Sequence, residues 1–210
     1  MMTRSEAPKN PLVTVLSLLF IIESLFGAVD VRSETPASHA EKPFDTITLA
    51  IQGVGATALG SFTDDWDPSP GGRVELVTPV YAGIARAGVH VFHHDAVDPA
   101  VPAFGSVYAY LGWAYEWKLP LSLMGSAGVE IGVAHMLFDD ESTDSARREE
   151  TELGFGITPQ LAYALTPCWS VLVTGEYRQI LTSRPIEYVL YGVGLSRTFS
   201  TPDWLKEFLE

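Results

Sequence analysis

The chain has 210 residues, a formal net charge of -13 and a hydrophobic fraction of 47%. Such acidity argues against a nucleic-acid binder, which carries a basic face, and the hydrophobic content excludes a disordered chain. The single cysteine, Cys168, excludes an internal disulfide framework and a cysteine-rich zinc site. The length suits one domain, with or without a targeting segment.

The first 28 residues have the order of a secretory signal. Arg4 and Lys9 precede an apolar run over 11–22, and the small residues Gly27 and Ala28 follow. The run is too short for a membrane-spanning helix, which needs roughly 20 residues. We predict a signal peptide over 1–28, cleaved after Ala28, and then a flexible mature N-terminus over 29–43. A buried or anchoring N-terminal helix is the alternative.

From residue 44 onward, apolar and small or polar residues alternate with a period of two. The clearest example is 106–117, where Leu111 and Trp113 share one face while Tyr110 and Gly112 share the other. This alternation is typical of half-buried strands. It predicts eight strands, at about 45–56, 72–79, 82–94, 105–117, 121–137, 151–165, 169–182 and 187–199.

The connections between these strands alternate in length. Those near 80–82, 118–120 and 166–168 are tight, and those at 57–71, 95–104 and 138–150 are long, acidic and rich in Pro or Gly. Short turns on one side and long loops on the other are typical of an up-and-down membrane barrel. We predict an all-β fold, an eight-stranded antiparallel up-and-down transmembrane β-barrel over 44–199.

The direction of the apolar face separates a membrane barrel from a soluble binding barrel, whose apolar face points inward. Here the apolar face carries the bulky side chains and the other face carries mostly Gly, Ser, Ala and Thr. Because eight strands enclose room only for side chains, the small set belongs inside. Aromatic residues near the tight turns then form an interfacial girdle. Its predicted members are Tyr81, Trp113, Tyr115, Trp117, Tyr163 and Trp169.

Charged residues of the inward face need partners, because an unpaired buried charge is costly. The predicted lumen charge network is Glu75, Arg86, Glu116, Glu130, Glu152, Glu176 and Arg178, with Arg73 and His90 of the same parity. We expect Glu130 to face Arg178 across the lumen, and Glu75 to meet Arg86 from a neighbouring strand. We expect these residues to fill the barrel rather than to catalyse a reaction, leaving at most a narrow, interrupted water path.

The last predicted strand, 188–199, alternates and ends on the aromatic Phe199. With the topology, this strand resembles the small eight-stranded outer-membrane β-barrel proteins of the OmpA/OmpX-like superfamily. The resemblance implies export across the inner membrane and insertion into a bacterial outer membrane by its insertion machinery, which would read an assembly signal at Tyr191, Gly194 and Phe199. It also implies contact with outer-membrane lipids and lipopolysaccharide. It does not fix an activity, and Arg197 stands where that signal usually has an apolar residue.

Two kinds of chemical site are conceivable from the residue types. The histidines at 90, 93 and 94 would need a further ligand to hold a metal. A hydrolase acting on lipid A needs a serine beside a histidine, yet Ser126 and His135 have opposite parity. We therefore expect no catalytic residue, no metal and no cofactor.

The expected function is a non-enzymatic structural or surface-interaction role through the long acidic extracellular loops. The alternatives are a narrow small-solute channel, a lipid A-modifying barrel enzyme and a soluble lipocalin-like binding barrel. The tail over 200–210 is predicted to be a short amphipathic periplasmic segment that anchors at the membrane interface or docks on a partner. The sequence is also compatible with a periplasmic or extracellular protein partner.

Overall fold

A computed structural model describes residues 43–139, 149–183 and 185–209 of the chain. The predicted signal peptide and nearly all of the predicted flexible N-terminus lie outside these residues. The described chain forms eight long strands that close into a barrel, and the predicted fold class is confirmed. The strands are β1 (Thr46–Leu59), β3 (Gly71–Val80), β4 (Gly83–Ala96), β5 (Phe104–Leu119), β6 (Leu123–Phe138), β7 (Glu149–Ala164), β8 (Trp169–Ile180) and β9 (Ile186–Ser200).

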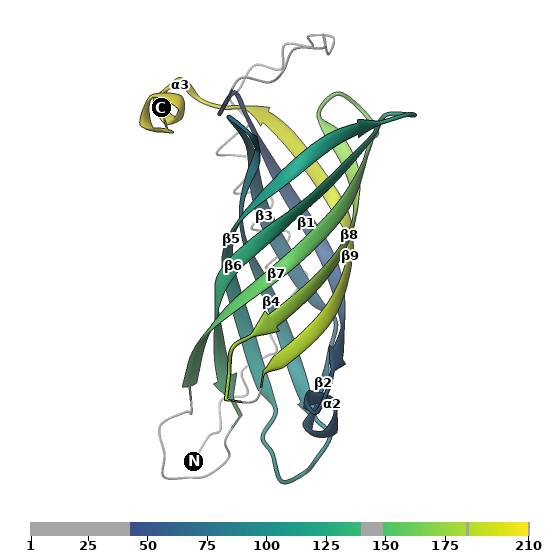
Figure 1. The fold of residues 1–210 in the computed structure, drawn as a ribbon, viewed down its shortest axis with the longest axis vertical. Coiled ribbons are helices and arrows are strands. Elements are labelled where there is room, and N and C mark those ends of the chain that lie inside the picture. Colours follow the sequence, from purple (N-terminus) through teal and green to yellow (C-terminus); the bar gives the residue numbers. More distant parts are fainter. Residues whose placement is uncertain (1–42, 140–148, 184, 210) are drawn as a thin grey trace, which may run out of the picture. The chain divides into compact units, whose positions relative to one another are not determined.

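Every long strand pairs antiparallel with its neighbours in sequence, and β1 closes the barrel against β9 (Figure 1). The closing ladder runs from Thr46↔Ser200 to Leu59↔Glu187. Closure leaves no long strand with an unpaired edge, which is the condition for crossing a membrane with strands. The observed strands lie within a few residues of the predicted ones.

The tight turns lie at one end of the barrel, called here the turn end. In the β5–β6 turn, Leu121 and Ser122 both adopt the left-handed region, with φ of 63° and 59°. Two successive left-handed residues give a tight turn a twist that matches that of the flanking strands. Gly83 in the β3–β4 turn has φ 93°, and a Cβ there would lie 2.2 Å from the carbonyl oxygen of Ala114. This turn therefore needs glycine.

The long connections lie at the opposite end, called here the loop end. The predicted loop over 57–71 contains a helix and a strand that the sequence did not reveal, α2 (Phe62–Asp65) and β2 (Trp66–Pro68). β2 extends the sheet by pairing with the end of β4. At the turn end, α3 (Asp203–Leu209) follows β9. Lys206 of this helix forms an ion pair with Asp45 at 2.8 Å.

Side chains alternate between the outer surface and the lumen. The outer surface carries large apolar residues; Leu111, for example, is 67% exposed and Ile131 is 63% exposed. The side chains that point into the lumen are buried and are of two kinds, the apolar core and a set of charged or polar residues. Neither described helix is long and apolar enough to cross a membrane.

Candidate functional site

The lumen contains three layers between the two ends of the barrel. The layer at mid-height, called here the ion cluster, contains Arg73, Glu75, Arg86, His90, Tyr110, Glu130, Glu176 and Arg178. The loop-end layer, the aromatic plug, contains Phe62, Phe92, His94, Phe104, Phe138 and Tyr188. The turn-end layer is a small polar pocket, the vestibule, lined among others by Thr48, Glu116, Ser126, Gln160 and Ser196.

Glu75 organises one half of the ion cluster. Its carboxylate oxygens lie 2.5 Å from Arg73 Nη2 and 2.9 Å from Arg86 Nη2, and the hydroxyl of Tyr110 donates to Oε2 over 2.5 Å. Arg73 Nε in turn donates to the Tyr110 hydroxyl over 2.7 Å. Charge-assisted bonds of this kind are stronger than neutral ones. The predicted neighbours Glu75 and Arg86 are thus in direct contact.

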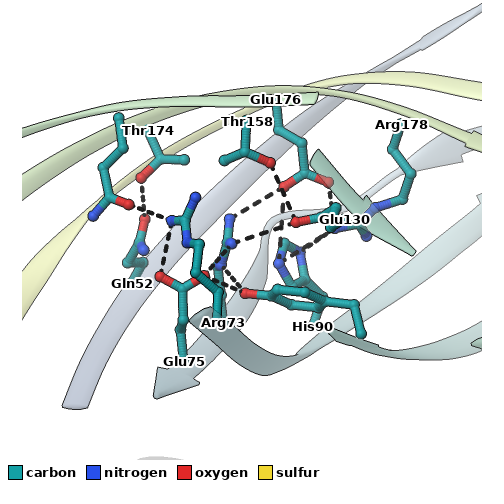
Figure 2. Close-up of polar contacts among 12 residues, drawn as sticks. Gln52, Arg73, Glu75, His90, Glu130, Thr158, Thr174, Glu176 and Arg178 are labelled. Carbon is teal, nitrogen blue, oxygen red and sulfur yellow. Dashed lines mark hydrogen bonds and ion pairs between the residues drawn. The ribbon is translucent and has the colours of Figure 1, made fainter. Parts of the chain in front are cut away.

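Arg178 organises the other half (Figure 2). Its Nη2 lies 3.2 Å from Glu130 Oε1 and 2.5 Å from Glu176 Oε1, and it donates to His90 Nδ1 over 3.1 Å. Arg73 Nη1 joins the halves by reaching Glu176 Oε2 at 3.1 Å. The predicted pair Glu130 and Arg178 therefore lies within contact distance inside the lumen.

The ion cluster contains equal numbers of arginine and glutamate side chains. Three guanidinium groups, from Arg73, Arg86 and Arg178, face three carboxylates, and all six side chains are almost completely buried. Burying charges is tolerable only when they are paired and hydrogen-bonded. Neutral side chains add further bonds, such as the one from Thr158 Oγ1 to Glu130 Oε2 at 3.2 Å. The cluster spans the lumen as one connected polar layer.

Two members of the predicted charge network lie elsewhere. Glu116 is exposed and lines the vestibule, and Glu152 is half-buried on the inward side of β7, opposite Ala134. Both residues lie on the inward side of their strands, but at other heights along the barrel than the ion cluster. Conversely, parity placed Tyr110 inside, yet its bond to Glu75 was not anticipated. Gln160, another inward residue, bonds to Arg86 and connects the vestibule with the cluster.

The aromatic plug departs from the expectation that small residues fill the barrel. His94 stacks on Phe104 with 4.2 Å between ring centroids, and the hydroxyl of Tyr188 lies 2.9 Å from His94 Nε2. Phe62 from α2 enters this group, 5.6 Å from the Tyr188 ring. Small residues such as Gly128 and Gly132 do line the lumen, where backbone and side-chain atoms of β5 leave no room for a Cβ. The sequence signal was available, because Phe92, Phe104 and Tyr188 all have inward parity.

The histidines and the serine that were considered for a metal site or a hydrolase site have other surroundings in the structure. Among the residues that the structure describes, no group of three or more His, Cys, Asp and Glu is placed to hold a metal ion. Inside the barrel, His90 accepts a hydrogen bond from Arg178, and His94 is hydrogen-bonded to the hydroxyl of Tyr188. Ser126 is buried, whereas His135 is on the outer side beside Thr151, 3.0 Å from its hydroxyl.

The residues of the predicted girdle, Tyr81, Trp113, Tyr115, Trp117, Tyr163 and Trp169, are all exposed on the outside near the turn end. The Trp113 indole donates to the carbonyl of Ala82, which fixes the ring against the β3–β4 turn. The Arg197 guanidinium lies over the rings of Trp169 and Phe199, at 5.4 and 4.9 Å. Arg197 therefore has aromatic partners at this height, a cation–π arrangement.

Two residues of the predicted assembly signal also have packing roles in the finished barrel. The Tyr191 ring covers Gly55 of the neighbouring strand so closely that a Cβ on Gly55 would lie 2.3 Å from it. At Gly194, a Cβ would lie 2.1 Å from the carbonyl oxygen of Ile51. Neither glycine can be replaced without movement of the closing β1–β9 ladder or of the Tyr191 ring.

No known protein family and no curated protein matches the chain in sequence. Among solved structures, the chain is similar to neisserial surface protein A, with 13% identity and a TM-score of 0.55, over 73% of this chain and 96% of that one. It is also similar to a major outer membrane protein from Thermus thermophilus, with 16% identity and a TM-score of 0.51, over 73% and 99% of the two chains. The chain thus has the fold of small eight-stranded outer-membrane β-barrels.

Proposed function

We propose that this chain is an integral bacterial outer-membrane protein with a closed lumen, which acts without catalysis through the surface at its loop end. The apolar outer surface supports membrane insertion, because residues such as Leu111, Ile131 and Val193 would otherwise be exposed to water. Outer-membrane lipids and lipopolysaccharide would then be its immediate partners. The insertion machinery would act on the signal around Tyr191, Gly194 and Phe199.

The observation that carries the closed lumen is the ion cluster. Its six charged side chains occupy mid-height and are bonded to one another, so a passing ion would have to break several buried ion pairs. The aromatic plug adds a second, apolar layer at the loop end. A structural or surface-interaction role therefore fits the interior better than transport does. The acidic residues of the loops, among them Asp64, Asp67 and Asp98, remain exposed for contacts outside the barrel.

The test combines two measurements on the protein folded in lipid. We expect the chain to fractionate with the outer membrane and to change gel mobility on boiling, as folded barrels do. We also expect planar bilayers that contain it to show no discrete conductance steps. A chain that purifies without detergent would contradict the membrane assignment, and regular conductance steps would contradict the closed lumen.

A narrow small-solute channel is the second candidate. The vestibule favours it, because this polar pocket of about 120 Å³ enters the barrel from the turn end and reaches Gln160, which bonds to Arg86 of the ion cluster. If the cluster were a selectivity filter, wild-type protein would conduct, and Glu130→Ala or Arg178→Ala would change or abolish that conductance. Mass spectrometry of lipid A, with and without the gene, tests the less favoured role in lipid modification.

A further inference from the structure

A small cavity lies in the lumen between the ion cluster and the aromatic plug. It is called here the interlayer cavity, and its volume is about 10 Å³. Arg178 lines it from the ion cluster, and Phe92, His94 and Tyr188 line it from the aromatic plug. The other lining residues are Ala56, Ser106, Tyr108, Ala134, Ile180 and Leu190. The lining thus comes from six of the eight long strands, β1, β4, β5, β6, β8 and β9.

Two polar atoms of this lining are buried without a hydrogen-bond partner. The hydroxyl of Tyr108 and Nε of Arg178 form no hydrogen bond with any residue that the structure describes. Both residues are only 2% exposed. The Arg178 guanidinium lies over the Tyr108 ring, 3.9 Å from its centroid, so the two groups are neighbours. A buried donor without a bond carries the full desolvation cost of that donor.

The contacts of Arg178 in the ion cluster leave its Nε unused. They are made by Nη2, which contacts Glu130, Glu176 and His90 at 3.2, 2.5 and 3.1 Å (Figure 2). These contacts hold the guanidinium in one orientation, so Nε cannot turn toward another acceptor without breaking them. Ser106 adds a further hydroxyl to the lining of the interlayer cavity. The cavity therefore has polar groups that can bond to a guest.

The size of the interlayer cavity selects its guest. A buried water molecule needs about 10–15 Å³ and two to four polar partners, and the cavity offers about 10 Å³. Arg178 Nε can donate to a water oxygen, and the hydroxyls of Tyr108 and Ser106 can donate or accept. Cavities that stay dry are lined by apolar groups, whereas this one has three polar groups of suitable chemistry. Size and chemistry together indicate a single water molecule.

We propose that the interlayer cavity binds one water molecule, which accepts a hydrogen bond from Arg178 Nε and bonds to the Tyr108 hydroxyl. The Ser106 hydroxyl would be its third partner. This water would join the ion cluster to the residues beneath the aromatic plug and satisfy both buried polar atoms. The inference goes beyond the proposed function, because it concerns the interior and holds whatever the loop end contacts.

The first test is a crystal structure of the folded full chain, at a resolution that shows ordered water, from crystals grown with sodium bromide. We expect one density peak in the interlayer cavity, within about 3.2 Å of both Arg178 Nε and Tyr108 Oη, without anomalous signal at the bromine absorption edge. A cavity without density would overturn the proposal. So would an anomalous peak, because the site would then take a monatomic anion.

The second test uses Tyr108→Phe, which removes only the hydroxyl. If water bonds to this hydroxyl, the equilibrium constant for folding in lipid vesicles should fall about fivefold, as expected for one lost hydrogen bond. Without the water, the hydroxyl would be an unsatisfied buried group, and its removal would leave that constant unchanged or raise it.

Tyr115→Phe is the matched control, because it removes the same atom from a tyrosine that is 61% exposed on the outer surface. We expect this variant to change the constant by less than about twofold. A constant that rises in Tyr108→Phe, or that changes equally in the two variants, would overturn the proposal. Either result would leave heat-modifiable mobility and the absence of conductance intact, so it is distinct from a failure of the proposed function.

Discussion

At the scale of single residues, Glu75 shows what holds the interior together. It is 0% exposed and accepts bonds from Arg73, Arg86 and Tyr110. Its negative charge is the direct counterpart of two guanidinium groups that are themselves buried. Removing one partner of a buried ion pair costs about 3–5 kcal/mol, because the remaining charge is left uncompensated.

Glu75→Gln is therefore expected to lower the free energy of unfolding by about 3–5 kcal/mol. The measurement is reversible urea unfolding in lipid vesicles, followed by tryptophan fluorescence. Glu116→Gln is the matched control, since Glu116 is on the same inward face but is exposed at the vestibule. We expect its cost to stay below about 1 kcal/mol. Equal losses in the two variants would show that burial in the ion cluster does not set the cost.

Which residues point inward could be predicted from the sequence, but not which of them meet. Strand alternation alone placed Arg73, Glu130 and Arg178 on the inner face, because successive side chains of a strand point to opposite sides. Contacts across the lumen also depend on the stagger between strands, which alternation does not encode. For this reason parity could not show that Glu116 lies at the vestibule and not in the ion cluster. It also could not show the bond from Tyr110 to Glu75.

At the scale of elements, the strands were predictable and the loop structure was not. Each strand from β5 to β9 repeats its alternation over a dozen residues or more, whereas α2 and β2 are too short to show a period. Their positions depend on tertiary contacts, such as the packing of Phe62 in the aromatic plug. The tail that was predicted as a short amphipathic segment forms α3 over Asp203–Leu209.

Removing the aromatic group that α2 inserts should not open the barrel. Phe62→Ala takes a buried ring out of the aromatic plug, but the ion cluster below it remains complete. We expect this variant, like the control Phe62→Leu, to give no conductance steps in planar bilayers while keeping its heat-modifiable mobility. Steps that appear only in Phe62→Ala would mean that α2 is the gate and that the ion cluster lets ions pass.

At the scale of the whole molecule, the central claim is that the apolar outer surface faces acyl chains. Leu111 and Leu121 are both highly exposed, at 67% and 83%. Leu111 lies in the middle of β5, where the membrane core would be, and Leu121 lies in the β5–β6 turn at the edge of the barrel. A soluble barrel would expose both positions to water in the same way.

The most direct test compares Leu111→Arg with Leu121→Arg by the free energy of unfolding from lipid vesicles. An arginine at the bilayer midplane costs about 2–4 kcal/mol, and one near the interface costs about 0–1 kcal/mol. We predict a loss in the first range for Leu111→Arg and in the second for Leu121→Arg. If the two substitutions cost the same, and the protein remains folded without lipid or detergent, the outer surface faces water and the membrane account is wrong.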